Sequence, residues 1–135
     1  MADVAVLGCG AWGTALAQML ASDGRDVTLW ALEPEVVAEI NSDHCNTPFL
    51  PDAELAPSIR ATGDLADVAD AQVVLAVVPA QHLRSVLEKM PGFAGDLVIC
   101  AKGIEQSTGA LMSDAAHDAC PQATLAALSG PTFAH

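Results

Sequence analysis

Short apolar runs alternate with helix-patterned segments along the chain, and this alternation predicts a parallel sheet covered by helices on both faces. Five runs rich in Val, Leu, Ile and Ala have the length and near-continuous hydrophobicity of buried strands. They are Asp3–Leu7, Asp26–Trp30, Gln72–Val78, Asp96–Cys100 and Ala123–Leu128. The pattern therefore predicts an α/β protein with a doubly wound, mostly parallel sheet.

The segments between these runs space their apolar residues at the helical period. The predicted helices are Trp12–Ser22, Pro34–Asn41, Pro79–Lys89 and Thr108–Ala119. In the first of them, Leu16, Met19 and Leu20 are expected to share the face that packs on the sheet. Ile59–Thr62 is expected to add a short strand, and Asp64–Ala69 a single helical turn.

One stretch, Asn41–Ser58, interrupts the alternation. It contains Pro48, Pro51 and Pro57, and each proline removes a backbone donor that regular structure would use. We therefore expect an irregular loop. A loop of this length is more often functional or partner-facing than idle.

Composition and charge narrow the class of protein. The chain has 135 residues, of which 52% are hydrophobic and 16% charged, which excludes a disordered acidic tail and leaves room for one domain. The net charge of −12, with five scattered basic residues, argues against a nucleic-acid partner. No apolar run reaches the ~18–20 residues of a membrane span, and no targeting signal is readable at the start, so we expect a cytoplasmic protein.

The cysteines and histidines do not form a recognisable disulfide or metal pattern. Cys9, Cys45, Cys100 and Cys120 contain no CxxC pair and lie tens of residues apart in mostly apolar surroundings, as buried reduced thiols do. The four histidines also lack zinc-ligand spacing. We expect neither a disulfide framework nor a bound metal.

The strongest local motif is a complete GxGxxG turn, residues 8–13, between the first predicted strand and the first predicted helix. Gly8 permits the tight turn, Gly10 lets the backbone approach a pyrophosphate, and Gly13 lets the helix pack closely on the strand. The anion would then lie on free amides at the positive end of the helix, near Ala11 and Trp12. This context predicts a Rossmann-type dinucleotide site, in which Trp12 either packs against the sheet or covers the cofactor.

An acidic residue stands where such sites recognise the adenosine ribose. Glu33 follows Gly13 by twenty residues, which is the distance at which a carboxylate binds the 2′-hydroxyl of NAD. The alternative is that Glu33 only caps the helix opened by Pro34. A 2′-phosphate about 5 Å from this carboxylate would be repelled by roughly 3 kcal/mol per unit charge at an effective dielectric near 20. No basic residue is near in the sequence, since Arg60 is the next after Arg25.

The chain resembles the N-terminal domain of bacterial NAD(P)-dependent sn-glycerol-3-phosphate dehydrogenase. Six sequence blocks carry the resemblance, and they occur in the same order as in that family. They are GCGAWGTALA (8–17), VTLW with EPE (27–30 and 33–35), CNTPFLPD (45–52), VVPAQ (77–81), AKGIE (101–105) and LSGPTFA (128–134). The resemblance implies reversible hydride transfer between a nicotinamide cofactor and sn-glycerol 3-phosphate or dihydroxyacetone phosphate, supplying glycerophospholipid synthesis. It implies that residues 1–135 are the dinucleotide-binding domain.

The resemblance also assigns residues on the nicotinamide side. Lys102 would contact both cofactor and substrate, Gly130 and Thr132 would meet the substrate, and Ala134 would meet the cofactor. The position of Lys102 suits this role, because it follows a predicted strand at the carboxyl end, where α/β sheets bind ligands. The alternatives are a solvated surface lysine and an ordinary strand-ending turn.

Two features depart from the family pattern. Members that use NADPH usually carry Arg or His where this chain has Leu32, so we expect NAD as the cofactor and NADP as the alternative. The family continues into a helical domain that supplies a proton-accepting lysine, whereas this chain stops at His135. We therefore expect no catalytic base here and an inactive isolated fragment.

The expected partners are a small phosphorylated substrate, the C-terminal helical domain and, in the full-length protein, a second copy. Two other functions remain open. One is another two-domain dehydrogenase of the ketopantoate reductase type, and the other is a non-catalytic NAD-sensing module.

Overall fold

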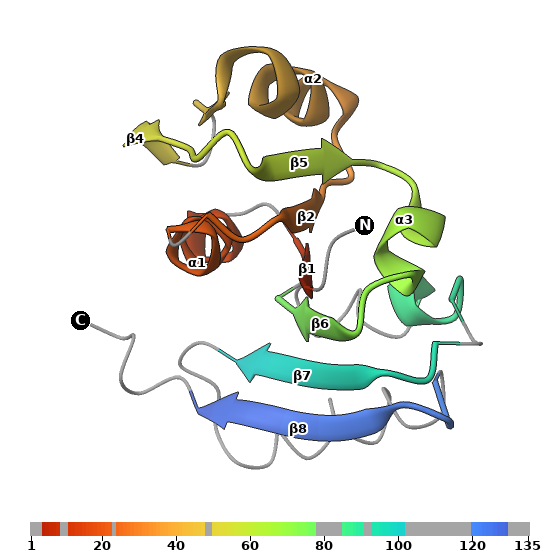
Figure 1. Ribbon diagram of the computed structural model, residues 1–135. Coiled ribbons are helices and arrows are strands. Elements are labelled where there is room, and N and C mark those ends of the chain that lie inside the picture. The colour runs from red at the N-terminus through yellow and green to blue at the C-terminus, as the bar shows by residue number, and fades with distance from the viewer. Residues whose placement is uncertain are drawn as a thin grey trace.

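The computed structural model describes residues 4–8, 11–22, 24–47, 50–77, 85–90, 93–101 and 120–129. Six strands pair in parallel in the order β5-β2-β1-β6-β7-β8, which Figure 1 shows from top to bottom. Their bounds are β1 (Val4–Leu7), β2 (Val27–Trp30), β5 (Ile59–Thr62), β6 (Val73–Ala76), β7 (Asp96–Ala101) and β8 (Thr124–Ser129). This is the doubly wound Rossmann order, so the predicted fold class is confirmed.

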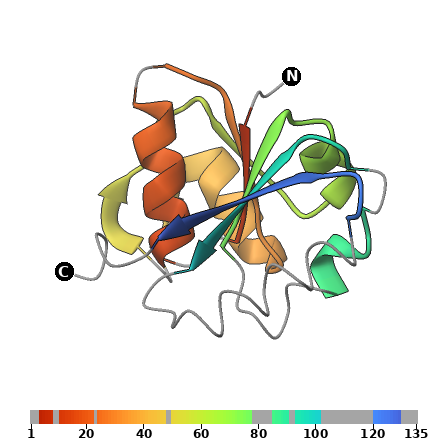
Figure 2. The same ribbon diagram turned by 90° about the horizontal axis from the view of Figure 1, so that it is seen from below.

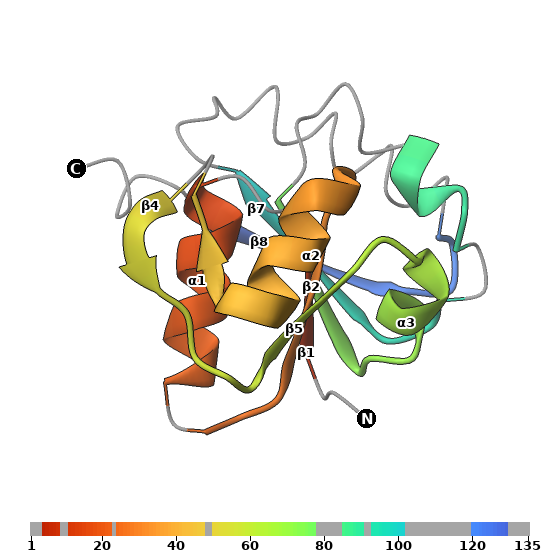
Figure 3. The same cartoon turned by 90° about the horizontal axis from the view of Figure 1, so that it is seen from above.

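Helices cover the two faces of the sheet unequally. On one face, termed the α1/α2 face, lie α1 (Ala11–Ala21) and α2 (Pro34–Asp43); on the other, the α3 face, lie α3 (Leu65–Ala69) and residues 85–90. Figures 2 and 3 show α1 and α3 on opposite sides of the twisted strands.

Each face of the sheet has its own buried core. Val6 and Leu29 pack with α1 and α2, whereas the next residues along the same strands, Leu7 and Trp30, pack with α3 and residues 85–90. Strands buried on both faces need apolar residues at every position, which is why they read as continuous hydrophobic runs.

The helices agree with the sequence prediction in place but not in every detail. Met19 of α1 is 56% exposed, so the prediction that it faces the sheet is wrong. Leu16 is buried as expected, and the rest of the contact is made by Ala17 and Ala21, which are also buried. Small alanines let the helix axis approach the strands, and this moves the centre of the buried stripe away from Met19.

The prediction that Asn41–Ser58 is irregular is also wrong. Strand β3 (Cys45–Asn46) pairs antiparallel with β4 (Leu50–Glu54), and Figure 3 shows β4 beside α1. Pro51 is compatible with β4 because both members of a two-stranded pair are edge strands, and an edge position tolerates a residue without an N–H group.

Contacts with both helices of the α1/α2 face hold this hairpin. Asn46 is fully buried and its side-chain Nδ2 donates to Oγ1 of Thr14 in α1, at 2.8 Å. The backbone N–H of Thr47 donates to Glu39 in α2 at 3.0 Å, and its hydroxyl donates to the same carboxylate. These bonds hold the pKa of the Glu39 carboxyl below its usual range. Tertiary partners therefore create the regularity that the prolines made improbable.

A side chain forms hydrogen bonds with the backbone of β5, which is an edge strand of the sheet. Asn41 of α2 donates from Nδ2 to the carbonyl of Ala61 in β5 and accepts the N–H of the same residue, both at 2.9 Å. The side-chain amide thus replaces a neighbouring strand at this position and blunts an edge that could otherwise pair with another chain.

Several predicted features fall partly or wholly outside the described residues. Of the predicted helix Pro79–Lys89 only residues 85–89 are described, with 85–87 helical, and the predicted helix Thr108–Ala119 lies outside the described residues. Cys45 is half-buried and Cys120 buried, and both are free thiols, while the other two cysteines have no described side chain. Within the described ranges, no helix is long and apolar enough to cross a membrane, and no three metal-ligating side chains cluster.

Candidate dinucleotide-binding site

The carboxyl end of β1 is the point where the chain changes face. After β1 it enters α1 on the α1/α2 face, whereas residues 85–90, which follow β6, pack on the α3 face. Backbone hydrogen bonds join the carboxyl ends of β1, β2 and β6. The N–H of Gly8 donates to the carbonyl of Trp30 at 3.1 Å, and the N–H of Val77 donates to the carbonyl of Leu7 at 2.8 Å. Doubly wound sheets bind their ligands in the crevice outside such a switch point.

The described part of the glycine motif has the geometry that a nucleotide turn requires. Gly8 has a φ of 119°, which only glycine adopts without strain. A Cβ atom on Gly13 would overlap the carbonyl oxygen of Gly8, so α1 packs against the end of β1 with no space for a side chain. Gly10 lies outside the described residues.

The first turn of α1 suits an anion. The helix begins at Ala11 and has no acidic side chain in its first turn, so its free amides keep their positive potential. Trp12 is half-buried and packs against the core of the α1/α2 face. That contact supports the packing role of Trp12, and its role as a cover for the cofactor stays a prediction.

Glu33 lies between the end of β2 and the first residue of α2. Its backbone is extended, with φ −86° and ψ 117°, and its carbonyl accepts the N–H groups of Val36 and Val37 at 3.1 and 3.2 Å. Its carboxylate makes no capping hydrogen bond to the helix. The alternative role of Glu33 as a side-chain cap therefore has no support in the structure.

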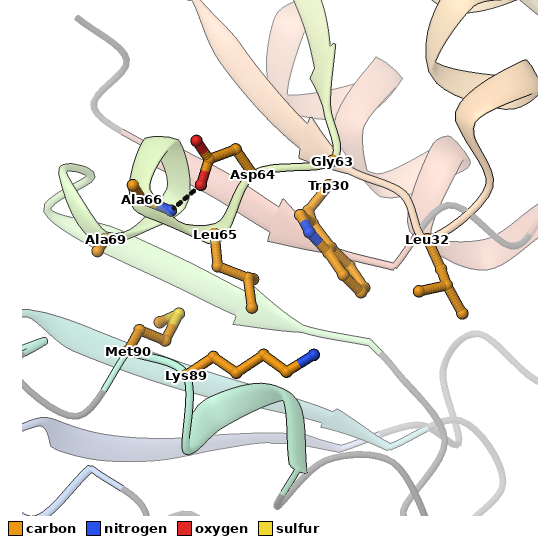
Figure 4. Close-up of a pocket in the computed structure, with 9 residues that line it drawn as sticks. All are labelled: Trp30, Leu32, Gly63, Asp64, Leu65, Ala66, Ala69, Lys89 and Met90. Carbon is orange, nitrogen blue, oxygen red and sulfur yellow. Dashed lines mark hydrogen bonds between the residues drawn. The ribbon is translucent and has the colours of Figure 1, made fainter.

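A pocket of about 520 Å³ opens on the α3 face beside the end of β2. Figure 4 shows its lining residues, which are Trp30, Leu32, Gly63, Asp64, Leu65, Ala66, Ala69, Lys89 and Met90. Trp30 is only 7% exposed, and its indole Nε1 has no hydrogen-bond partner among the described residues. A ligand with a hydrogen-bond acceptor near Trp30 would satisfy the indole N–H, which is costly to leave buried and unpaired.

The pocket corrects one inference from the sequence. No basic residue was expected near the ribose position, because none is close to Glu33 along the chain. In the structure Lys89 lines the same pocket as Leu32, the residue before Glu33, and Figure 4 shows its ammonium group extending toward Leu32 and Trp30. Sequence distance could not reveal that the two residues line one pocket, because their placement depends on how the two crossovers fold over the sheet.

The residues predicted for the nicotinamide side, Lys102, Gly130, Thr132 and Ala134, lie outside the described residues. The strands that lead to them are described. Strand β7 ends at Ala101, which pairs with Ser129 at the end of β8. The first residues of the AKGIE and LSGPTFA blocks therefore lie at the carboxyl ends of neighbouring parallel strands.

A family model described as NAD-dependent glycerol-3-phosphate dehydrogenase N-terminus matches residues 3–135. The chain belongs to this family. It is 60% identical over 134 residues to glycerol-3-phosphate dehydrogenase [NAD(P)+] of Erythrobacter litoralis, and 63% identical over 133 residues to that of Novosphingobium aromaticivorans. These matches cover 99% and 98% of the chain and 41% and 40% of the relatives.

A solved structure gives the same result for the fold. The glycerol-3-phosphate dehydrogenase of Coxiella burnetii superposes with a TM-score of 0.83 at 30% identity, covering 97% of this chain and 41% of the other. The chain thus spans about two fifths of the length of its glycerol-3-phosphate dehydrogenase relatives. The family match also decides against the ketopantoate reductase alternative.

Proposed function

We propose that the chain is the dinucleotide-binding domain of an NAD(P)-dependent glycerol-3-phosphate dehydrogenase. The observation that carries the proposal is the close packing of Gly13 on the Gly8 carbonyl at the switch point of the sheet, in a chain 60% identical to a named enzyme of this kind. The described residues fit a dinucleotide, because the turn is tight and the first turn of α1 has no acidic side chain.

On the adenosine side, the amides around Gly8, Gly10 and Ala11 would hold the pyrophosphate at the start of α1. Glu33, at the end of β2, would accept a hydrogen bond from the ribose 2′-hydroxyl. Trp12 would support the turn from the α1/α2 core. These interactions favour NAD, because a carboxylate repels the additional phosphate of NADP.

On the nicotinamide side, Lys102 and Ala134 would complete the cofactor site, and Lys102, Gly130 and Thr132 would bind the phosphorylated substrate. The pairing of Ala101 with Ser129 supports this assignment, because these residues directly precede Lys102 and Gly130 in the sequence. The lysine would stabilise negative charge on the substrate phosphate or on the C2 oxygen. When bound, NAD(P) supplies or accepts the hydride.

The proton acceptor is proposed to come from outside these residues. The relatives are about two and a half times as long as the part matched here, and the family resemblance places the accepting lysine in a helical domain within that remainder. The homodimer and the cytoplasmic location also stay predictions.

Cofactor binding tests the proposal directly. NADH and NADPH are titrated into the protein and their dissociation constants are measured by fluorescence. NADH is expected to bind more tightly. Gly10→Val should abolish binding of both while leaving a cooperative thermal transition, because its side chain would fill the pyrophosphate position. Retained affinity in this variant would place the nucleotide elsewhere.

Turnover separates a dehydrogenase domain from a sensing module. The chain alone is expected to show no oxidation of glycerol 3-phosphate by NADH absorbance, because the proton-accepting lysine is proposed to lie in the helical domain of the relatives. In a full-length enzyme, Lys102→Ala should lower kcat/KM about a hundredfold or more, or about 2.7 kcal/mol, with Tm little changed. A Lys102→Ala enzyme within about threefold of the unsubstituted enzyme would contradict the role of Lys102.

A further inference from the structure

The charged side chains around the pocket on the α3 face are not equivalent. Asp64 lines it, but its carboxylate accepts the N–H of Ala66 at 3.0 Å and so caps α3, and Figure 4 shows it turned toward that helix. Lys89 is exposed, and within the described ranges no ion pair or hydrogen bond to its ammonium group is found. Among the described residues the ammonium group of Lys89 therefore has no partner, whereas Oδ1 of Asp64 already accepts a hydrogen bond from the helix.

The surroundings of Lys89 favour interaction with an anion. Trp30, Leu65 and Met90 form apolar walls, which strengthen electrostatic attraction relative to open water. Leu32 is 75% exposed at the same pocket and adds no charge. It directly precedes Glu33, so the pocket borders the proposed ribose position.

We propose that Lys89 is a specificity residue of the cofactor site, and that its ammonium group binds the 2′-phosphate of NADP(H). The inference rests on the proposed function, because it needs the ribose near Glu33. A lysine is a compact charge on a flexible stem, so it can reach a phosphate without the fixed geometry of an arginine. Lys89 offsets the repulsion by Glu33 and lets the chain bind NADP(H) as a second cofactor.

The test is the pair of dissociation constants for NADPH and NADH in Lys89→Gln, measured by energy transfer from tryptophan to the reduced nicotinamide. NADPH is expected to bind about three- to tenfold more weakly, as for loss of one partly exposed ion pair. NADH is expected to change less than about twofold, and the NADPH effect is expected to shrink at high salt. Lys89→Glu should enlarge the NADPH loss without changing the direction.

Arg25→Gln is the matched control. It removes the same charge, but Arg25 precedes β2 at its amino end, whereas the pocket lies at the carboxyl end. Equal NADPH affinities in Lys89→Gln and Arg25→Gln would overturn the inference, as would equal losses for NADH and NADPH, or an unsubstituted chain that binds NADH but no NADPH. If the unsubstituted chain binds neither cofactor, the proposed function fails and this inference fails with it. Melting curves of both variants confirm that folding is retained.

Discussion

The two faces of the sheet meet the same candidate site in different ways. On the α1/α2 face, Gly13 packs on the Gly8 carbonyl with no space for one further carbon atom. On the α3 face, beside the end of β2, a pocket of about 520 Å³ remains, bordered by exposed Leu32 and Lys89. Backbone geometry therefore defines the candidate site on the α1/α2 face, whereas replaceable side chains define it on the α3 face.

Helix length explains the contrast. α1 has eleven residues and presents Ala17 and Ala21 to the sheet, so it covers the strands closely. α3 has only five residues and buries Leu65 and Val68. It therefore covers only part of the α3 face of the sheet, and the pocket lies beside it. We expect substitutions on the first face to affect folding and on the second to affect specificity.

The largest effect is expected from Gly13→Ala. Its Cβ would overlap the Gly8 carbonyl oxygen, so α1 must move away from β1. We expect the free energy of unfolding in urea to fall by about 3 kcal/mol, with loss of cofactor binding. Gly63→Ala on the pocket side is the control, because its Cβ would meet only Ala31 O at 3.6 Å. Equal losses in the two variants would contradict the proposed contrast.

The next effect is expected from Asn46→Ala. The substitution removes the buried hydrogen bond to Thr14 that ties the β3–β4 hairpin to α1. We expect a loss of about 1–3 kcal/mol in the free energy of unfolding. Ser42→Ala removes an exposed bond to the Ala38 carbonyl and should cost less than about 0.5 kcal/mol. If Asn46→Ala is as mild as this control, the hairpin is not held as described.

On the α3 face, Leu32→Arg should change specificity without changing stability. Leu32 is 75% exposed, so its loss exposes no core, while the arginine adds a fork of donors for a 2′-phosphate. NADPH affinity should rise about tenfold, or about 1.4 kcal/mol, relative to NADH. Met19→Arg adds the same charge at the other exposed large apolar residue described. A similar change in the NADPH to NADH ratio for Met19→Arg would show that only net charge matters.

The smallest effect concerns two thiols. Burial raises the pKa of the Cys120 thiol, whose Sγ lies 3.4 Å from the Met90 carbonyl and 3.6 Å from that of Leu87. The folded state therefore holds this proton more tightly than the unfolded chain, which titrates near 8.5. The contribution to stability should be intact below about pH 8 and decline as the pH rises through the raised value.

The relative reactivity of the two thiols is measured by alkylation followed by mass spectrometry of the peptides. At neutral pH, half-buried Cys45 should react faster than buried Cys120. Faster labelling of Cys120 would mean that the core of the α3 face opens more readily than the structure indicates. Cys120→Ala should remove the part of the alkaline loss of stability that belongs to this thiol.

Local pattern was enough to predict much of the fold. Ile59–Thr62 is a strand with the predicted bounds, and the runs around β1, β2, β6, β7 and β8 are strands within one or two residues. The hydrophobicity of the central strands β1, β2 and β6 is continuous because both of their faces are buried, so their strand signal does not depend on partners far along the chain. The glycine motif was predictable for a similar reason, since strand, turn and helix lie within consecutive residues.

Other features depended on contacts between distant segments. The alternation of strands and helices and the turn between β1 and α1 follow from the amino-acid sequence, because neighbouring residues decide both. Packing between distant segments determines that Asn41–Ser58 contains a hairpin, held by the Asn46–Thr14 hydrogen bond, and that Lys89 lines the same pocket as Leu32. Both depend on the order of the strands and the faces taken by the crossovers, and these are set by packing of the whole sheet.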